Sequence, residues 1–229
     1  MQISHKHKFV FFSFPKTGSE SVRKMLGPYA DIEVVPYWNR TEEQPFYSHM
    51  SPAEVKEQFE QYGWEFDDYF RFTFVRNPWA RLVSLYNMIY RSRIPTTLTQ
   101  RVRQWVTRPG EKVPAFKEWL ESTHPDGPGG GGPADQRWQV YGTWSIATYI
   151  LDEHGRHLVD DVIKLEEIGE KLHPVLARIG IPSAETLEIP FVNKGKRQSY
   201  TSYYDDESSD WVSKRYRYDI EQFGYQFGD

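Results

Sequence analysis

The segment of residues 9–26, FVFFSFPKTGSESVRKML, constrains the fold of this chain more than any other stretch. Phe9–Phe14 is apolar except for one serine, which is typical of a short strand buried on both faces. After Gly18 the apolar residues recur at helical spacing, at Val22, Met25 and Leu26. The segment therefore predicts a strand, a tight turn and a helix that lies on the sheet.

The turn between this strand and helix has the chemistry of an anion site. Backbone N–H groups at a helix N-terminus are unpaired and partially positive, and a glycine lets that backbone approach a ligand closely. We expect the turn to bind a phosphate or a sulfate through Lys16, Thr17, Gly18, Ser19 and Ser21. The alternative is an ordinary strand-to-helix connection in which the hydroxyls cap the helix.

The turn differs from the loop G-x-x-x-x-G-K-[ST], which binds nucleoside triphosphates. Its lysine precedes the glycine, and no glycine stands in the five residues before Lys16. A site for a Mg²⁺-triphosphate usually has an aspartate at the end of a neighbouring strand, whereas the next apolar strand here ends in Arg76 and Asn77. The sequence therefore lacks the expected metal ligand of such a site.

A second unit of strand, turn and helix lies further along the chain. Tyr69–Val75 reads as a strand, and Pro78 opens the helix that follows. Arg76 stands at the strand end, and Ser84 lies two turns into the helix. Two such units imply a parallel sheet whose carboxyl ends gather ligand groups, so we expect Lys16 and Arg76 at the same edge. A salt bridge is the alternative role for Arg76.

Length and composition favour one soluble domain over residues 1–229. Hydrophobic residues make up 38% of the chain and aromatic residues 16%, which predicts an aromatic core. The chain has no cysteine, no long apolar run and no signal-peptide pattern, so we expect a cytoplasmic protein without membrane insertion. A net charge of -4 argues against a general nucleic-acid binder, so any anion site must be local.

His49 lies just before a strongly signalled helix. Ser51, Pro52 and Glu54 supply a capping hydroxyl, a proline at the first helical position and a glutamate at the third, which predicts a helix to about Tyr62. From the residues alone, a histidine in such a loop is more often a surface or capping residue than a catalytic one.

The remaining elements are shorter or less clearly marked. Residues 31–37 predict a short strand whose end is weakened by Pro36, and residues 161–165 predict another strand. Residues 166–179 predict a helix that is interrupted or bent at Pro174. Further helices are expected in parts of 114–120 and 138–150, with a last helix over 209–223 capped by Ser208 or Ser209.

Three further segments are rich in basic residues or in glycine. Residues 91–112 hold six basic residues against one acidic residue, which suits either a solvated helix face or a surface for an acidic partner. Residues 125–133, PDGPGGGGP, predict a mobile loop or linker that could serve as a substrate lid. A second basic segment that could close over an anion contains Lys194, Gly195, Lys196 and Arg197.

The two turn motifs resemble those of the sulfotransferases that use 3′-phosphoadenosine 5′-phosphosulfate (PAPS), in particular the carbohydrate, Golgi-type branch called sulfotransferase family 2. FSFPKTGSES resembles the family's 5′-phosphosulfate loop, FTFVRNPWARLVSLYN its 3′-phosphate motif and FGYQF its closing segment. The two motifs with their elements cover about a quarter of the chain and are specific as a pair. The resemblance implies an α/β fold with a P-loop-like central parallel sheet flanked by helices.

The resemblance also implies roles for the candidate residues. Lys16 would contact the 5′-phosphosulfate and the leaving oxygen, with Thr17, Gly18, Ser19 and Ser21 lining the cradle. The 3′-phosphate would be held by Arg76 and Ser84, and the segment Lys194, Gly195, Lys196 and Arg197 would fold over the donor phosphates. His49 stands where the family's general base is commonly found, and a near-neutral pKa suits a base that takes a hydroxyl proton. No metal is implied.

The implied reaction moves the sulfuryl group of PAPS to a hydroxyl of an acceptor by in-line displacement. The acceptor implied is a carbohydrate, and the basic segment 91–112 would suit an acidic glycan, with small hydroxylated acceptors as the alternative. Without a membrane anchor or cysteine pairs, the chain is most like a short, soluble, bacterial-type member. Two other functions stay open, a nucleotide kinase or ATPase and a glycan-binding module without catalysis.

Overall fold

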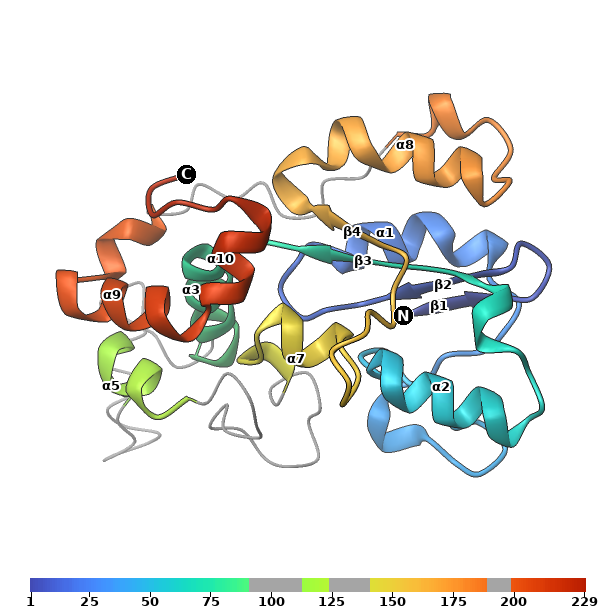
Figure 1. The fold of residues 1–229 in the computed structure, drawn as a ribbon, viewed down its shortest axis with the longest axis horizontal. Coiled ribbons are helices and arrows are strands. Elements are labelled where there is room, and N and C mark those ends of the chain that lie inside the picture. The colour runs from blue at the N-terminus through green and yellow to red at the C-terminus, as the bar shows by residue number, and fades with distance from the viewer. Residues whose placement is uncertain (91–112, 124–140, 189–198) are drawn as a thin grey trace, which may run out of the picture.

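A four-stranded sheet forms the centre of the computed structural model of the protein, which describes residues 1–90, 113–123, 141–188 and 199–229 (Figure 1). The strands are β1 (Gln2–Ser4), β2 (Phe9–Phe12), β3 (Phe70–Val75) and β4 (Asp161–Lys164), in that spatial order. β1 runs antiparallel to β2, whereas β2, β3 and β4 are parallel. The predicted α/β class with a mainly parallel central sheet is therefore confirmed.

Both predicted units of strand, turn and helix form. β2 leads into α1 (Ser19–Leu26), and β3 leads into α3 (Pro78–Tyr90). Phe9 pairs with Phe70, the first residue of β3, so the two parallel strands begin side by side. The turns that follow them therefore lie at the same edge of the sheet. All four residues of β2 are buried, as expected for a central strand covered on both faces.

The sheet separates two apolar cores. Side chains alternate between the faces of a strand, so Phe9 and Phe11 belong to the core under α1 and α8 (Ile168–Arg178), while Val10 and Phe12 belong to the other. The second core includes side chains of α2 (Pro52–Gln61), α3 and α7 (Ile146–Ile150). Figure 1 shows α8 and α1 on one side of the sheet and α2 and α7 on the other.

Further helices gather beyond the carboxyl ends of the strands. They are α5 (Phe116–Glu121), α9 (Asp206–Arg215) and α10 (Arg217–Phe223), which lie near α3 in Figure 1. The predicted last helix over 209–223 is therefore two helices, divided at the fully buried Tyr216. Its cap is Asp205 instead of Ser208 or Ser209, because the Asp205 carboxylate accepts the Ser208 N–H at 2.7 Å. Pro174 does not interrupt α8, which continues to Arg178.

The predicted strand at 31–37 is wrong. Ile32 and Val35 make only isolated bridges, to two different parts of the chain, so no continuous ladder forms. Pro36 has no N–H to donate, and the 3-10 turn η2 (Tyr37–Asn39) begins directly after it. β1 was not predicted, because three residues with one apolar side chain carry too little periodicity.

Candidate active site

Three loops meet at the carboxyl edge of the parallel strands. The loop of residues 13–18 follows β2, Arg76 and Asn77 follow β3, and Glu166 comes shortly after β4. Arg76 Nη1 donates to the backbone oxygen of Lys16 at 3.5 Å, and the Asn77 N–H donates to Glu166 Oε1 at 3.1 Å. The parallel topology thus brings Lys16 and Arg76 to one edge, as the sequence predicts.

The turn after β2 has a constrained backbone. Lys16 and Gly18 both adopt left-handed conformations, with φ of 67° and 74°. For a lysine this conformation costs on the order of 1 kcal/mol, and such residues gather at functional sites. Gly18 also lies close to Leu165, the residue that follows β4, because a Cβ at position 18 would stand 2.7 Å from Leu165 Cδ1. The turn is therefore curled tightly between β2 and α1.

The cap position of α1 is Gly18, which has no hydroxyl. Thr17 is fully buried, and its hydroxyl donates to the Phe14 backbone oxygen at 2.8 Å. Ser19 and Ser21 are also buried, and the cap position of α1 makes no side-chain hydrogen bond, in contrast to α2 and α9. The cap position is therefore not occupied by a hydroxyl side chain, and a helix N-terminus with a glycine at its cap suits an anion.

Lys16 reaches from this turn towards α3. Its Nζ lies 3.2 Å from Sδ of Met88, which is exposed. Ser84 lies one helical turn before Met88, on the same face of α3. The Lys16 ammonium therefore lies along the helix face that carries Ser84, while the Lys16 backbone contacts Arg76.

His49 is tied to the same turn. Its Nδ1 lies 2.7 Å from the Ser13 backbone oxygen, which can only accept, so Nδ1 carries the proton and Nε2 carries the lone pair. Burial lowers the pKa of His49 to about 3, and nearby positive charges, Arg23 and Lys16 among them, act in the same direction. The near-neutral pKa expected from the sequence is therefore wrong. At neutral pH the imidazole is uncharged and can accept a proton at Nε2.

A half-buried carboxylate holds the loop that carries His49. Glu54 accepts hydrogen bonds from the hydroxyls of Tyr47 and Tyr141, each at 2.6 Å, and from the Ser51 N–H at 2.9 Å. Burial opposes ionisation of Glu54, but these hydrogen bonds outweigh it and lower its pKa. The predicted cap of α2 is therefore confirmed, and the two tyrosine hydroxyls connect its glutamate to the apolar core.

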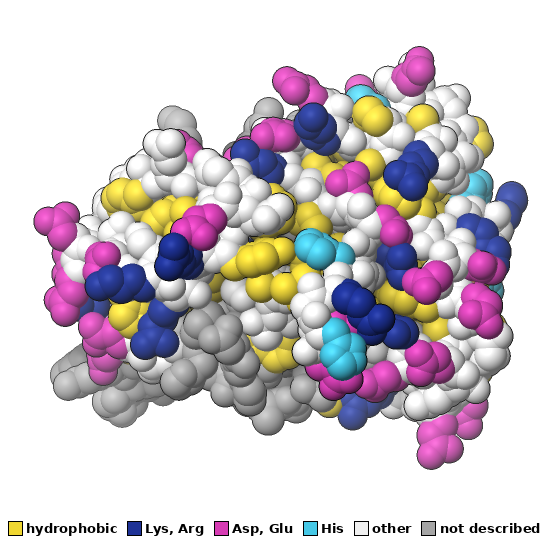
Figure 2. All heavy atoms as spheres, viewed as in Figure 1, with side chains coloured by type: hydrophobic (Ala, Val, Ile, Leu, Met, Phe, Trp, Pro, Cys, Tyr) yellow, Lys and Arg dark blue, Asp and Glu magenta, His cyan; other side chains and the backbone are white. Residues whose placement is uncertain are grey.

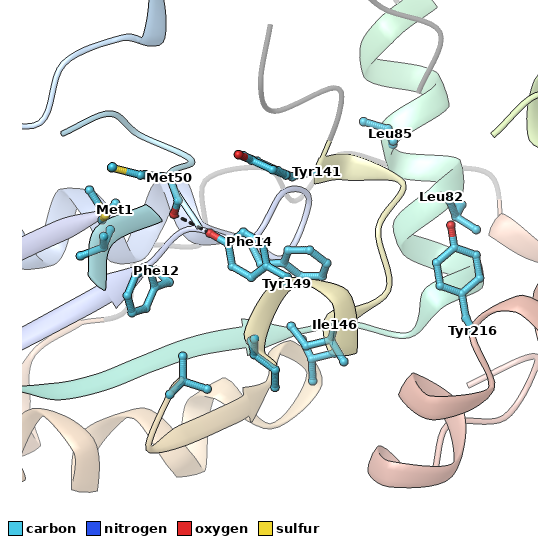
Figure 3. Close-up of a cluster of buried hydrophobic side chains, with 14 of the residues drawn as sticks. Met1, Phe12, Phe14, Met50, Leu82, Leu85, Tyr141, Ile146, Tyr149 and Tyr216 are labelled. Carbon is cyan, nitrogen blue, oxygen red and sulfur yellow. Dashed lines mark hydrogen bonds between the residues drawn. The ribbon is translucent and has the colours of Figure 1, made fainter. Parts of the chain in front are cut away.

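Phe14 connects this loop to the Lys16 turn. The Phe14 and Tyr149 ring centroids are 4.8 Å apart, and the Tyr149 hydroxyl donates to the Met50 backbone oxygen at 3.0 Å (Figure 3). Met50 follows His49, and Phe14 precedes Lys16 by two residues. The two candidate catalytic residues are therefore attached to one packed core.

Sequence reasoning missed how the C-terminal segment joins the site. Asn77 Nδ2 donates to the Gln226 backbone oxygen at 2.9 Å, and the Tyr225 hydroxyl donates to Glu166 Oε2 at 3.1 Å. These contacts hold the FGYQF segment on the ends of β3 and β4. Asn77 could have been found from its place beside Arg76, whereas Glu166 follows a short strand and belongs to no motif.

Arg81 is a second residue that the sequence analysis missed. It is fully buried on α3, where Nη1 donates to the Gly142 backbone oxygen at 2.8 Å and Nη2 to that of Trp144 at 2.5 Å. Its guanidinium also lies 4.5 Å from the centroid of the Phe14 ring. Arg81 therefore joins α3, the chain before α7 and the Lys16 turn.

Some of the predicted features lie outside the described residues. They are the basic segment 91–112, the loop 125–133 and the residues Lys194, Gly195, Lys196 and Arg197. In the described part of the chain, no group of His, Asp and Glu side chains is arranged to hold a metal ion. No helix in that part has both the length and the apolar character that a membrane span requires.

A groove of about 610 Å³ beside β4 is separate from the candidate site. Its lining comes mainly from β4, α8 and α10, with Phe70 of β3 and Glu167, and includes none of the candidate residues. Figure 2 shows that basic and acidic side chains are interspersed on the face of the molecule around α8, without a field of one sign.

Comparison with known proteins gives a match to a family model that covers nearly all of the chain. No curated protein and no solved structure matches it significantly. The sequence pattern of the sulfotransferase family, however, matches residues 1–226, which include both turn motifs and the C-terminal segment held on β3 and β4. The chain therefore belongs to the sulfotransferase family.

Proposed function

We propose that the protein transfers the sulfuryl group of PAPS to a hydroxyl group of a carbohydrate. Family membership supports sulfuryl transfer in general. The observation that carries the choice of donor is the contact of two anion-binding elements, since Arg76 Nη1 lies 3.5 Å from the Lys16 backbone oxygen beside the uncapped α1. A donor with phosphates on both its 5′ and 3′ positions needs two such elements. The absence of cysteine fits a cytoplasmic location, which we also propose.

Each element has a distinct role in binding the donor. The Arg76 guanidinium can bind the 3′-phosphate through two N–H groups, with the Ser84 hydroxyl as a further donor. The 5′-phosphosulfate is bound by Lys16, by the N–H groups of residues 17–20 and by the side chain of Ser21, whose own N–H donates to the Gly18 backbone oxygen at 3.3 Å. The Thr17 hydroxyl is already bonded to Phe14, so Thr17 contributes its backbone. The segment 194–197 would cover the phosphates.

In the proposed reaction, His49 accepts the proton of the acceptor hydroxyl at Nε2. The acceptor oxygen forms a bond to sulfur while the bond from sulfur to the 5′-phosphate oxygen breaks, and the electron pair of that bond stays on the phosphate. Lys16 and the α1 N–H groups stabilise the charge on this oxygen. The products are a sulfate ester, 3′-phosphoadenosine 5′-phosphate and a proton on His49, which then passes to water.

Calorimetric titration with 3′-phosphoadenosine 5′-phosphate, without metal, tests the donor. We expect micromolar binding, and we expect Arg76→Ala to abolish it because the 3′-phosphate loses its guanidinium. Arg156→Ala removes an exposed arginine that pairs with Asp152, and it should leave binding unchanged. Preference for ATP with Mg²⁺ would instead favour the kinase or ATPase. Binding of an anionic glycan that survives Lys16→Ala, without turnover, would favour the binding module.

A further inference from the structure

A sulfur atom lies beside the ammonium group of Lys16. Met88 Sδ on α3 is 3.2 Å from Lys16 Nζ, so the ammonium donates a hydrogen bond to the thioether. A thioether is a weak acceptor, and the proposed transfer reaction gives this sulfur no part in binding or catalysis. Met88 therefore contacts a proposed catalytic group without a role of its own in the reaction.

Exposure distinguishes Met88 from the other methionines. It is 38% exposed, whereas Met25 is 9%, Met50 6% and Met1 1% exposed. The chain has four methionines and no cysteine, so its sulfur atoms are these four thioethers. Because an oxidant must contact the sulfur atom, Met88 should be oxidised well before the three buried methionines.

The backbone on both sides of this contact is held in place. On α3, the Tyr86 hydroxyl donates to the Pro114 backbone oxygen at 2.7 Å, two residues before Met88. On the turn, Lys16 has a constrained left-handed backbone with φ of 67°, and its backbone oxygen accepts from Arg76. The contact between the two side chains therefore depends on how strong an acceptor the side chain of Met88 is.

Oxidation of Met88 changes this acceptor. Hydrogen peroxide transfers one oxygen atom to Sδ, which is oxidised by two electrons, and the rest of the peroxide leaves as water. The product is methionine sulfoxide, whose polar oxygen is a stronger acceptor for a charged N–H group than the thioether. This oxygen is bonded to the atom that Lys16 already contacts, so it lies within reach of the ammonium. A lysine bonded to the sulfoxide is less available to a phosphate or sulfate.

We propose that Met88 is a site of reversible oxidation by peroxide, and that its sulfoxide binds the Lys16 ammonium and weakens donor binding. For its effect on the donor, the proposal rests on the proposed sulfuryl transfer, and it adds a regulation of the same site. Methionine sulfoxide reductases return the sulfoxide to the thioether. Reduction should therefore release Lys16 and restore the site.

Peptide mapping by mass spectrometry tests the site without any assumption about the substrate. After treatment with hydrogen peroxide, Met88 should be oxidised well before Met25 and Met50. An amine-acylating reagent then measures how available Lys16 is. Its labelling should fall severalfold on oxidation, but not in Met88→Leu, which has no sulfur at this position. Exposed Lys24, which pairs with Glu20 on α1, should be labelled equally before and after oxidation.

Calorimetry with 3′-phosphoadenosine 5′-phosphate measures the consequence for the donor site. We expect oxidation to weaken binding about tenfold or more, and a methionine sulfoxide reductase to restore it. Met88→Gln carries an amide oxygen on a side chain of similar length, so it should weaken binding without any oxidant. In Met88→Leu, binding should not change on treatment with peroxide. The matched control Met25→Leu should stay as sensitive to peroxide as the unsubstituted protein.

Three results would each overturn the proposal. They are oxidation of the buried methionines as fast as Met88, labelling of Lys16 that oxidation leaves unchanged, and equal sensitivity to peroxide in Met88→Leu and Met25→Leu. If the untreated protein does not bind 3′-phosphoadenosine 5′-phosphate, the proposed donor is wrong. The labelling of Lys16 then still decides whether the sulfoxide of Met88 binds this lysine.

Discussion

At the scale of single residues, the tautomer of His49 leads to a kinetic prediction. Because Nδ1–H is bonded to Ser13, Nε2 is the nitrogen that can accept the acceptor proton. His49→Ala should lower kcat by about 10²–10⁴-fold while binding of 3′-phosphoadenosine 5′-phosphate is nearly kept. Steady-state kinetics and calorimetry on one preparation measure both quantities. Equal losses of donor affinity in His49→Ala and Arg76→Ala would refute this division of roles.

The low pKa of His49 also predicts how stability depends on pH. The unfolded state takes up a proton below about pH 6.5, whereas the folded state stays neutral until the pKa of about 3. The free energy of unfolding should therefore fall as pH decreases through this window, by up to about 1.4 kcal/mol per pH unit. Urea denaturation between pH 7 and pH 4 measures the slope. His49→Gln should reduce it, whereas the change of exposed His154 to Gln should not.

Substitution of Gly18 tests two separate contributions to the free energy of unfolding. One is the left-handed backbone at this position, and the other is the close packing against Leu165. Gly18→Ala forces alanine to a φ of 74° and places a methyl group 2.7 Å from the end of the flexible Leu165 side chain, which must shift, so we expect a loss of about 2 kcal/mol in the free energy of unfolding. Gly63→Ala has a similar φ of 67° with nothing within 4 Å, and it should lose only about 1 kcal/mol. Equal losses would show that Leu165 does not constrain the turn.

At the scale of elements, buried Arg81 joins three segments, and its removal should be costly. Arg81→Met leaves the carbonyls of Gly142 and Trp144 without their donors, so we expect a loss of about 2–5 kcal/mol. Arg156→Met, at an exposed pair, should lose less than about 1 kcal/mol. Chemical denaturation compares the two variants. A small effect of Arg81→Met would mean that the helix packing around α3 does not depend on this arginine.

Elements with a clear local pattern could be predicted from the sequence, whereas elements that depend on pairing with a distant segment could not. The runs of β2 and β3 and the cap of α2 are local signals, and each forms as expected. β1 exists because it pairs with β2, and residues 31–37 fail as a strand because their partners lie on two different segments. In the site, Lys16 and Arg76 belong to sequence motifs and could be predicted. Leu165 and Glu166 belong to no motif, and they lie in the site because β4 pairs with β3 in this register.

At the scale of the whole molecule, the proposed donor site should make folding depend on ligand. Lys16 belongs to the β2–α1 turn and Arg76 to the β3–α3 turn, so a ligand that binds both stabilises only the folded state. At 100 times its Kd, such a ligand adds about 2.7 kcal/mol, which for a chain of this size raises Tm by about 5–10 °C.

Thermal denaturation with 3′-phosphoadenosine 5′-phosphate measures this shift. Arg76→Ala should remove most of the shift in Tm, because the ligand is then bound by one turn only. Arg156→Ala should leave the shift unchanged. A shift that survives Arg76→Ala in full would show that the ligand binds without the second turn. In that case the meeting of the two turns, on which the choice of donor rests, would have no part in its recognition.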